Sequence, residues 1–273
     1  MGFLRKMRNF AADIEDCFEG RRGSSRPKII LNDLMISRTE KINSSDERNL
    51  QELDWDNLLI LDACRHDIYE EVTGERVDFN YTKNSMTRYY IRDNFLEGDW
   101  SDTVYITLNP HFSEEIFEEL TGRKPEDVFF EVFESWKDVE GEERKFDPEV
   151  LLRDARTAQK LFPEKKLIVH FMQPHVPFEN HPETPERYNY KDEEYDVWEG
   201  VIRGEIDAEG AIEAYKKNLE FVMPYVEDLV EDLRGLSVIT SDHGNLIGEG
   251  NFYGHPRGYS SVGLRKVPWD VRN

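Results

Sequence analysis

The chain has little cysteine, no long apolar run and a shortage of positive charge. Its 273 residues include two cysteines, Cys17 and Cys64, which are too few for a disulfide framework or a thiolate metal cluster. No stretch approaches the roughly 18 apolar residues of a membrane span, and the amino terminus lacks the apolar core of a signal peptide. We therefore expect a reducing, cytoplasmic setting and no transmembrane segment.

The charge balance narrows the range of partners. The chain carries 35 Lys and Arg against 57 Asp and Glu, a formal net charge of −22. This balance excludes unaided binding to nucleic acid, which needs a basic face to replace counterions, and it disfavours an anionic membrane surface. An acidic surface of this kind suits high salt, where screening weakens self-repulsion, so the composition is typical of a halophilic protein.

The amino-terminal segment is expected to be separate from the main domain. Apolar residues between positions 3 and 18 follow helical spacing, with basic residues between them. They predict an amphipathic helix that docks on the domain, or alternatively a peripheral helix for a membrane surface or a partner. Residues 19–27 (EGRRGSSRP) are typical of a linker, so the expected division is 1–27 for helix and linker and 28–273 for a single domain.

Four continuous apolar runs predict buried strands, at residues 57–62, 103–108, 166–172 and 236–241. Segments with helical spacing, including 148–161 and 208–233, lie between them. Strands that alternate with helices predict an α/β fold with a doubly wound, mostly parallel sheet covered by helices on both faces. Ligands of such sheets bind beyond the carboxyl ends of the strands.

Metal-ligand types follow these strands. Asp62 ends the first run, and Asp242 and His243 follow the fourth. Carboxylate and imidazole groups that arrive from two strands suit one divalent cation such as Zn or Mn. Each residue also has an ordinary structural interpretation, because an Asp caps turns and a His satisfies loop carbonyls.

A hydroxyl-rich segment, YTKNSMTRYY at residues 81–90, precedes an expected helix that runs through Phe95. A Ser or Thr at a helix start commonly caps the helix. Its oxygen can instead bind a cation and attack a phosphorus or sulfur centre held by the backbone amides of the helix. Position alone leaves both interpretations open.

Several segments in this order resemble the alkaline phosphatase superfamily in its sulfatase-like branch, most closely sulfatase-like proteins of halophilic archaea. They are LLILDACRHD, NSMTRYY, IVHFMQPHVPF and VITSDHGNLIGE, followed by GHP and VPW, and the resemblance spans residues 53–269. It implies an alkaline-phosphatase-like core.

The resemblance also implies roles for single residues. Thr87 would be the nucleophile, with Ser85 as the reserve choice. Arg65 and Arg88 would clamp an anion, although either could form an ordinary surface ion pair. The remaining roles are metal binding by Asp62, Asp242, His243 and Thr87, and substrate binding by His175 and His255.

Departures from the family pattern limit the chemistry. Neither Cys64 nor Cys17 begins the Cys-x-Pro/Ala-x-Arg motif that formylglycine sulfatases need. Phe171 stands where two-metal members have an Asp, four residues before His175, so a single divalent metal (Mn, Zn, Mg or Ca) is expected. His170, inside a predicted strand, is interpreted as a core residue.

Two functional hypotheses follow. The first is a metal-dependent hydrolase or transferase that acts on phosphate or sulfate esters, small or linked to a glycan or lipid, through a Thr or Ser nucleophile. The second is a non-catalytic binding or scaffold protein that retains the sulfatase-like fold. They differ in whether Asp62, Thr87, Asp242 and His243 must converge on one point.

Overall fold

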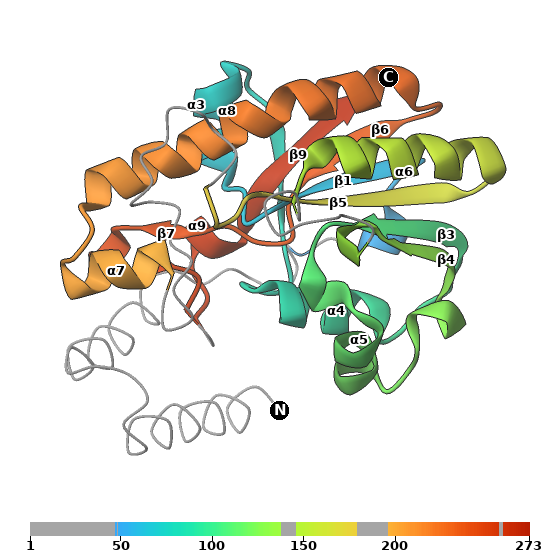
Figure 1. Ribbon diagram of the computed structural model, residues 1–273, viewed down its shortest axis with the longest axis horizontal. Helices are drawn as coiled ribbons and strands as arrows, with labels where there is room; N and C mark the ends of the chain where they lie inside the picture. The colour runs from blue at the N-terminus through green and yellow to red at the C-terminus, as the bar shows by residue number, and fades with distance from the viewer. Residues whose placement is uncertain (1–46, 48, 138–145, 179–195, 257–258) are drawn as a thin grey trace.

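A seven-stranded sheet forms the centre of the computed structural model, which describes residues 47, 49–137, 146–178, 196–256 and 259–273 (Figure 1). The helix and linker expected within residues 1–27, and Cys17 with them, lie outside the described residues. The sheet order is β2-β9-β6-β1-β5-β3-β4. The strands are β1 (Asn57–Asp62), β2 (Asp78–Tyr81), β3 (Trp100–Thr107), β4 (Phe129–Glu134), β5 (Lys166–Pro174), β6 (Ser237–Thr240) and β9 (Lys266–Arg272).

Helices lie between most of these strands. A two-stranded hairpin, β7 (Leu246–Ile247) with β8 (Tyr253–Gly254), stands apart from the main sheet. The α-helices are α3 (His66–Thr73), α4 (Thr87–Phe95), α5 (Glu114–Thr121), α6 (Pro148–Leu161), α7 (Val197–Arg203), α8 (Ala208–Asp232) and α9 (Val262–Arg265). None of the described helices is long and apolar enough to cross a membrane.

The predicted mostly parallel sheet is confirmed. β6, β1, β5, β3 and β4 pair in parallel, and they include all four of the strands predicted from apolar runs. On the other side of β6, β9 pairs antiparallel with β6, and the edge strand β2 pairs antiparallel with β9. Because β1, β3, β5 and β6 run in the same direction, their carboxyl ends meet at one edge of the sheet.

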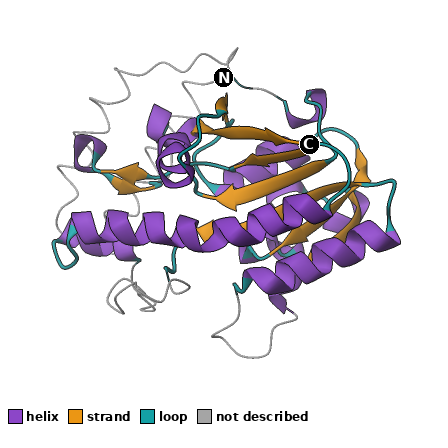
Figure 2. Ribbon diagram, turned by 90° about the horizontal axis from the view of Figure 1, so that it is seen from above, coloured by secondary structure: helices purple, strands orange, loops and turns teal. Residues whose placement is uncertain are grey.

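Alternate residues of β1 enter different cores. Leu59 and Leu61 belong to the core under α3, α6 and α8, whereas Leu58 and Ile60 belong to the core on the side of α4 and α5. Figures 1 and 2 show these helices on the two sides of the sheet. Burial on both faces explains why the sequence of β1 is continuously apolar, since a strand between two helical layers has no solvent face.

Candidate active site

Three segments bring four predicted residues together at the carboxyl edge of the sheet. Asp62 is the last residue of β1, Asp242 and His243 follow β6, and Thr87 is the first residue of α4. One ligand atom from each of Asp62, Asp242 and His243 lies within 4.8 Å of the other two, and all three side chains are buried. A cation at this point would be held by side chains from two neighbouring strands.

The hydrogen bonds of His243 leave a lone pair directed at two carboxylates. Its Nδ1 lies 2.9 Å from the carbonyl oxygen of Gly244 and donates to it, so Nε2 of the neutral ring carries no proton. That nitrogen lies 3.6 Å from Oδ1 of Asp62 and 3.5 Å from Oδ2 of Asp242. Neither oxygen has a hydrogen-bond partner among the described residues. Three buried acceptor atoms that face one another fit a divalent cation, because one positive charge satisfies all three at once.

Burial and mutual repulsion act differently on the two carboxyl groups. Burial raises the pKa of Asp62 well above its ordinary value, and the neighbouring Asp242 carboxylate raises it further. Burial also acts to raise the pKa of Asp242, but His243, His170 and the Ala63 amide outweigh it and lower that pKa. In the metal-free site Asp242 therefore ionises readily, whereas ionisation of Asp62 costs free energy. A bound cation would offset that cost.

Backbone groups fix the Asp242 side chain. Its Oδ1 accepts hydrogen bonds from the amides of Ala63 at 3.0 Å and of His243 at 2.9 Å, which leaves Oδ2 directed at the cluster. Ala63 has a φ of 60°, a left-handed conformation that costs an alanine free energy. Tyr215 supports this turn, because its hydroxyl donates to the Ala63 carbonyl oxygen and accepts from the amide of Arg65.

The glycine after His243 is required by close packing. A Cβ on Gly244 would lie 2.3 Å from the carbonyl oxygen of Gly263, so any other residue would push two backbone segments apart. The Gly244 amide donates to the Leu264 carbonyl oxygen at 2.8 Å. This contact anchors the loop that carries Asp242 and His243.

The structure separates the two hydroxyl candidates. Oγ1 of Thr87 lies 3.3 Å from Nε2 of His243. The Ser85 hydroxyl instead donates to the Tyr259 carbonyl oxygen at 2.5 Å. Thr87 makes no capping hydrogen bond, and residue Met86 occupies the cap position. The Thr87 hydroxyl therefore belongs to the cluster of Asp62, Asp242 and His243.

The two predicted substrate histidines contact each other beside the cluster. Nε2 of His175 lies 3.0 Å from Nε2 of His255, and the His255 ring lies 4.6 Å from the His243 ring. Nδ1 of His175 lies 2.6 Å from the Val176 carbonyl oxygen and donates to it. Burial lowers the pKa of His175 to about 4 and that of His255 well below its ordinary value, so both rings are neutral near pH 7.

The two arginines predicted as anion clamps have partners within the protein. Arg65 is buried, and its guanidinium donates to Asp67, to Glu249 and to the Asn245 carbonyl oxygen. These contacts tie the start of α3 to the loop after β6, which is a structural role. Arg88 forms two hydrogen bonds of 3.0 Å with Glu119, so an incoming anion would compete with that carboxylate.

Sequence reasoning missed the role of Asn109. This fully buried residue follows β3, and its amide nitrogen donates to Oδ2 of Asp62, which leaves Oδ1 directed at the cluster. The signal available was its position directly after a predicted strand. His111, two residues later, is exposed.

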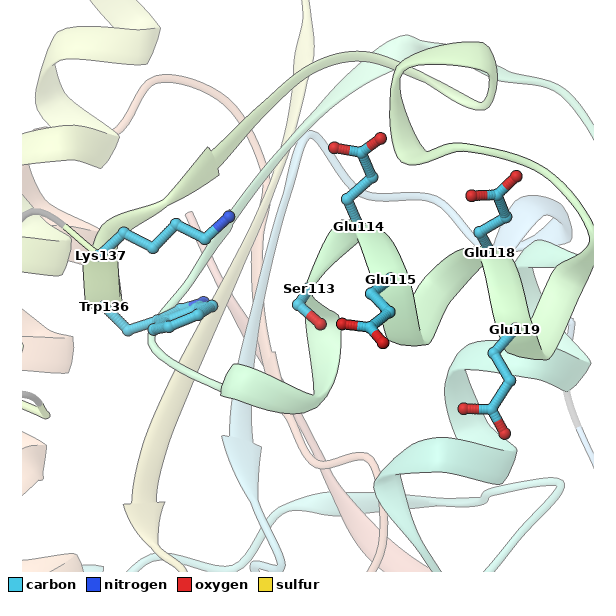
Figure 3. Close-up of a pocket in the computed structure, with 7 residues that line it drawn as sticks. All are labelled: Ser113, Glu114, Glu115, Glu118, Glu119, Trp136 and Lys137. Atoms are coloured by element: carbon cyan, nitrogen blue, oxygen red, sulfur yellow. The ribbon is translucent and has the colours of Figure 1, made fainter.

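A groove of about 730 Å³ lies away from the cluster, between α5 and the turn that holds Trp136 and Lys137 (Figure 3). Four glutamates line it: Glu114, Glu115, Glu118 and Glu119. Such a surface repels an anion. The groove is therefore unsuited to a phosphate or sulfate ester, and the cluster of Asp62, Asp242 and His243, which can hold a cation, remains the candidate site.

Comparisons with known proteins found similar solved structures at low sequence identity. No protein-family model matches it, and neither does any curated protein. One similar structure is the C-terminal periplasmic domain of EcEptC from Escherichia coli in complex with Zn, with 12% identity, a TM-score of 0.49, and coverage of 78% of this chain and 71% of that one.

Two other similar structures belong to different enzymes. BT1596, a 2-O GAG sulfatase, matches with 12% identity and a TM-score of 0.48, over 80% of this chain and 63% of that chain. The lipoteichoic acid synthase LtaP from Listeria monocytogenes matches with 10% identity and a TM-score of 0.43, over 88% and 70% of the two chains. Identities and TM-scores this low do not show what activity this chain has. The resemblance to halophilic archaeal proteins stays a prediction.

Proposed function

We propose that this protein is a hydrolase or transferase of phosphate or sulfate esters that uses Thr87 as its nucleophile and one divalent cation as cofactor. The observation that carries the proposal is the convergence of three buried acceptor atoms, from Asp62, Asp242 and His243, beside the Thr87 hydroxyl. A binding protein that retained only the fold would have no need for unsatisfied acceptors at this point, because orphaned buried groups destabilise a fold.

The ligand atoms of the cluster determine which cations it can bind. Two carboxylate oxygens, one imidazole nitrogen and the Thr87 hydroxyl give four ligands of the kind that Zn and Mn accept. When bound, the cation supplies positive charge that lowers the pKa of the Thr87 hydroxyl and stabilises negative charge on the transferred group. Asn109 and the Ala63 amide orient the two carboxylates for this purpose.

Thr87 performs the bond-forming step in this proposal. The hydroxyl proton of Thr87 passes to solvent as its oxygen attacks the phosphorus or sulfur atom, and the bond to the leaving oxygen breaks while that oxygen takes a proton from water. The transferred group remains on Thr87 until water or an acceptor hydroxyl removes it. Thr87 and Arg88 open α4, and neither of their amides has a hydrogen-bond partner among the described residues. These amides can donate to the oxygens of the transferred group.

His175 and His255 lie where they can hold the leaving oxygen by a hydrogen bond. Since Nδ1 of His175 donates to the backbone, its Nε2 accepts, and the proton between the two rings belongs to Nε2 of His255. Both rings lie beside His243 rather than in the acidic groove. This neutral pair can hold an ester oxygen without requiring a buried positive charge.

Phosphate esters are the preferred substrate class, because the chain lacks the Cys-x-Pro/Ala-x-Arg motif that formylglycine sulfatases need. A glycan-linked or lipid-linked ester, as an alternative to a small one, rests on the resemblance alone. The test is a panel of aryl phosphate monoesters, diesters and aryl sulfates, assayed with added Mn, Zn, Mg or Ca. Metal-dependent turnover that disappears in Thr87→Ala supports the proposal. Turnover of no ester with any metal by the folded protein contradicts it.

A further inference from the structure

His170 has a buried ring nitrogen that the proposed chemistry does not use. The residue lies in β5 with no exposed surface. Its Nδ1 lies 2.8 Å from the Tyr105 hydroxyl, whereas its Nε2 has no hydrogen-bond partner among the described residues. That nitrogen lies 4.0 Å from Oδ2 of Asp242, which is also without a partner there. A polar nitrogen buried in this way needs an explanation.

The Tyr105 hydroxyl decides which nitrogen of His170 carries the proton. Within the described part of the chain, this buried hydroxyl has no hydrogen-bond partner except Nδ1 of His170. A buried hydroxyl that does not donate its proton loses free energy, so Tyr105 donates and Nδ1 accepts. The proton of the neutral imidazole is then on Nε2, where it is directed at Oδ2 of Asp242. Phe112 stacks on the Tyr105 ring, with centroids 3.9 Å apart, and holds it in place.

The opposite assignment would make His170 a fourth protein ligand of the cation. It requires a lone pair on Nε2 and a proton on Nδ1, which would donate to the Tyr105 oxygen. The hydroxyl proton of Tyr105 would then have no acceptor among the described residues. The arrangement therefore favours a donor role for His170.

We infer that Tyr105 and His170 form a positioning pair, in which Tyr105 fixes the Nε2–H tautomer of His170 and that N–H orients Oδ2 of Asp242 toward the cation. The inference rests on the proposed function, because it assigns the pair to the cluster of that site. The Ala63 and His243 amides hold Oδ1, and the Nε2–H of His170 faces Oδ2 from 4.0 Å, so it acts on the orientation of Oδ2 by electrostatic attraction rather than by a hydrogen bond. Partners of metal ligands commonly change metal affinity by about 10–100-fold when they are removed.

Nitrogen NMR on metal-free, ¹⁵N-histidine-labelled protein tests the tautomer directly. The His170 signals are assigned by their loss in His170→Gln. We expect protonated Nε2 and unprotonated Nδ1 in the wild type, and a mixture of tautomers in Tyr105→Phe. Tyr90→Phe is the matched control, since Tyr90 is a buried tyrosine of the same core whose hydroxyl has no partner among the described residues. A proton on Nδ1 in the wild type overturns the inference.

Zinc affinity, measured by calorimetric titration with Zn²⁺, tests the effect on the cluster. We expect His170→Phe to weaken binding about 10–100-fold. His170→Gln should recover most of the affinity, because its amide can donate like Nε2–H but is a poor zinc ligand. Equal loss in both variants, or a zinc-coordinated Nε2 in the spectrum, would make His170 a ligand and overturn the inference. Absence of zinc binding by the wild type would contradict the proposed function, whereas the metal-free spectrum would still decide the tautomer.

Discussion

The Thr87 hydroxyl lies 3.3 Å from Nε2 of His243, although 156 residues separate the two along the chain. The contact forms because α4 begins at the edge where β6 ends. It places a hydroxyl that can act as a nucleophile beside an imidazole that can bind a metal, and both side chains are buried.

Thr87→Ala should abolish ester turnover, with a loss of about 10³-fold or more in kcat, because no other hydroxyl takes the place of a covalent nucleophile. Thr87→Ser keeps a hydroxyl at the start of α4 and should retain measurable activity. Ser85→Ala is the matched control, since Ser85 donates to a backbone carbonyl outside the cluster. Steady-state kinetics on an aryl phosphate would check all three. Loss of activity in Ser85→Ala with survival in Thr87→Ala would move the nucleophile to Ser85.

Removal of the metal should destabilise the wild-type protein. Dialysis against a chelator leaves the Asp62, Asp242 and His243 acceptors without a common partner. Readdition of Zn²⁺ at 100 times its Kd should raise the free energy of unfolding by about 2.7 kcal/mol, as mass action requires. Thermal unfolding with and without the metal would measure the difference. A wild-type Tm that does not respond to any divalent cation would contradict a metal site.

Asp62→Asn should stabilise the metal-free protein while it abolishes metal binding. The pKa of Asp62 is raised in the folded state, first by burial and then by Asp242, so the folded protein holds this proton more tightly than the unfolded chain does. The metal-free wild type therefore loses stability as pH rises from the ordinary value of 3.8 through the raised pKa. An Asn cannot ionise, so the variant escapes the loss, and its amide group fills nearly the same space.

We expect the free energy of unfolding of Asp62→Asn to exceed that of the metal-free wild type near neutral pH, with the gap closing in acid. Asp242→Asn is the matched control with the opposite sign, because the pKa of Asp242 is lowered and its ionised form is stabilised. Urea unfolding in chelator at several pH values measures both variants. A destabilised Asp62→Asn at neutral pH would show that the carboxylate is not strained in the metal-free site.

Sequence patterns predicted the centre of the sheet better than its edges. The runs of β1, β3, β5 and β6 are continuously apolar because helices cover both faces, and this pattern is visible without a structure. β4 and β9 were not predicted. β4 (FFEVFE) has an exposed phenylalanine and two glutamates at the sheet edge, and β9 contains a proline and charged residues. Such strands depend on their neighbours rather than on their own composition.

The sequence predicts which site residues lie at the ends of strands. It does not predict which hydrogen-bond partners their side chains have. Asp62, Asp242 and His243 sit at strand ends, so topology alone brings them together. The partners of Arg65 are a carboxylate two residues away and groups some 180 residues away, and no pattern distinguishes that arrangement from an anion clamp. The position of His170 within a strand likewise says nothing of the direction of its Nε2.

The stability of the metal-free protein should fall in acid through His175. Burial lowers its folded-state pKa to about 4 from an ordinary 6.5, so between these values the unfolded chain binds the proton and the folded protein does not. Stability is therefore present above about pH 6.5 and is lost as pH falls toward 4. His175→Gln keeps a polar side chain but cannot titrate, and it should reduce the slope of unfolding free energy against pH in this window. An unchanged slope would mean that His175 is freely solvated.

Reaction with an anionic ester should speed up with ionic strength. The formal net charge of −22 opposes the approach of an anion. Screening shortens the reach of this field from about 10 Å at 0.1 M salt to about 3 Å at 1 M salt. We expect kcat/KM for an aryl phosphate to rise with salt while kcat stays nearly constant, because screening acts on encounter and not on the bound complex.

The acidic groove allows this salt effect to be located on the molecule. Glu119 of the groove bonds Arg88, the residue after Thr87, so the groove lies on the Thr87 side of the site. Replacing its Glu115 and Glu118 by Gln should raise kcat/KM at low salt and flatten its salt dependence. The double variant Glu164→Gln with Glu231→Gln is the matched control. Both residues precede strands, so they lie toward the amino-terminal ends of the strands, opposite the site. Equal effects of the two double variants would assign the repulsion to net charge, and a fall of kcat/KM with salt in the folded wild type would contradict repulsion altogether.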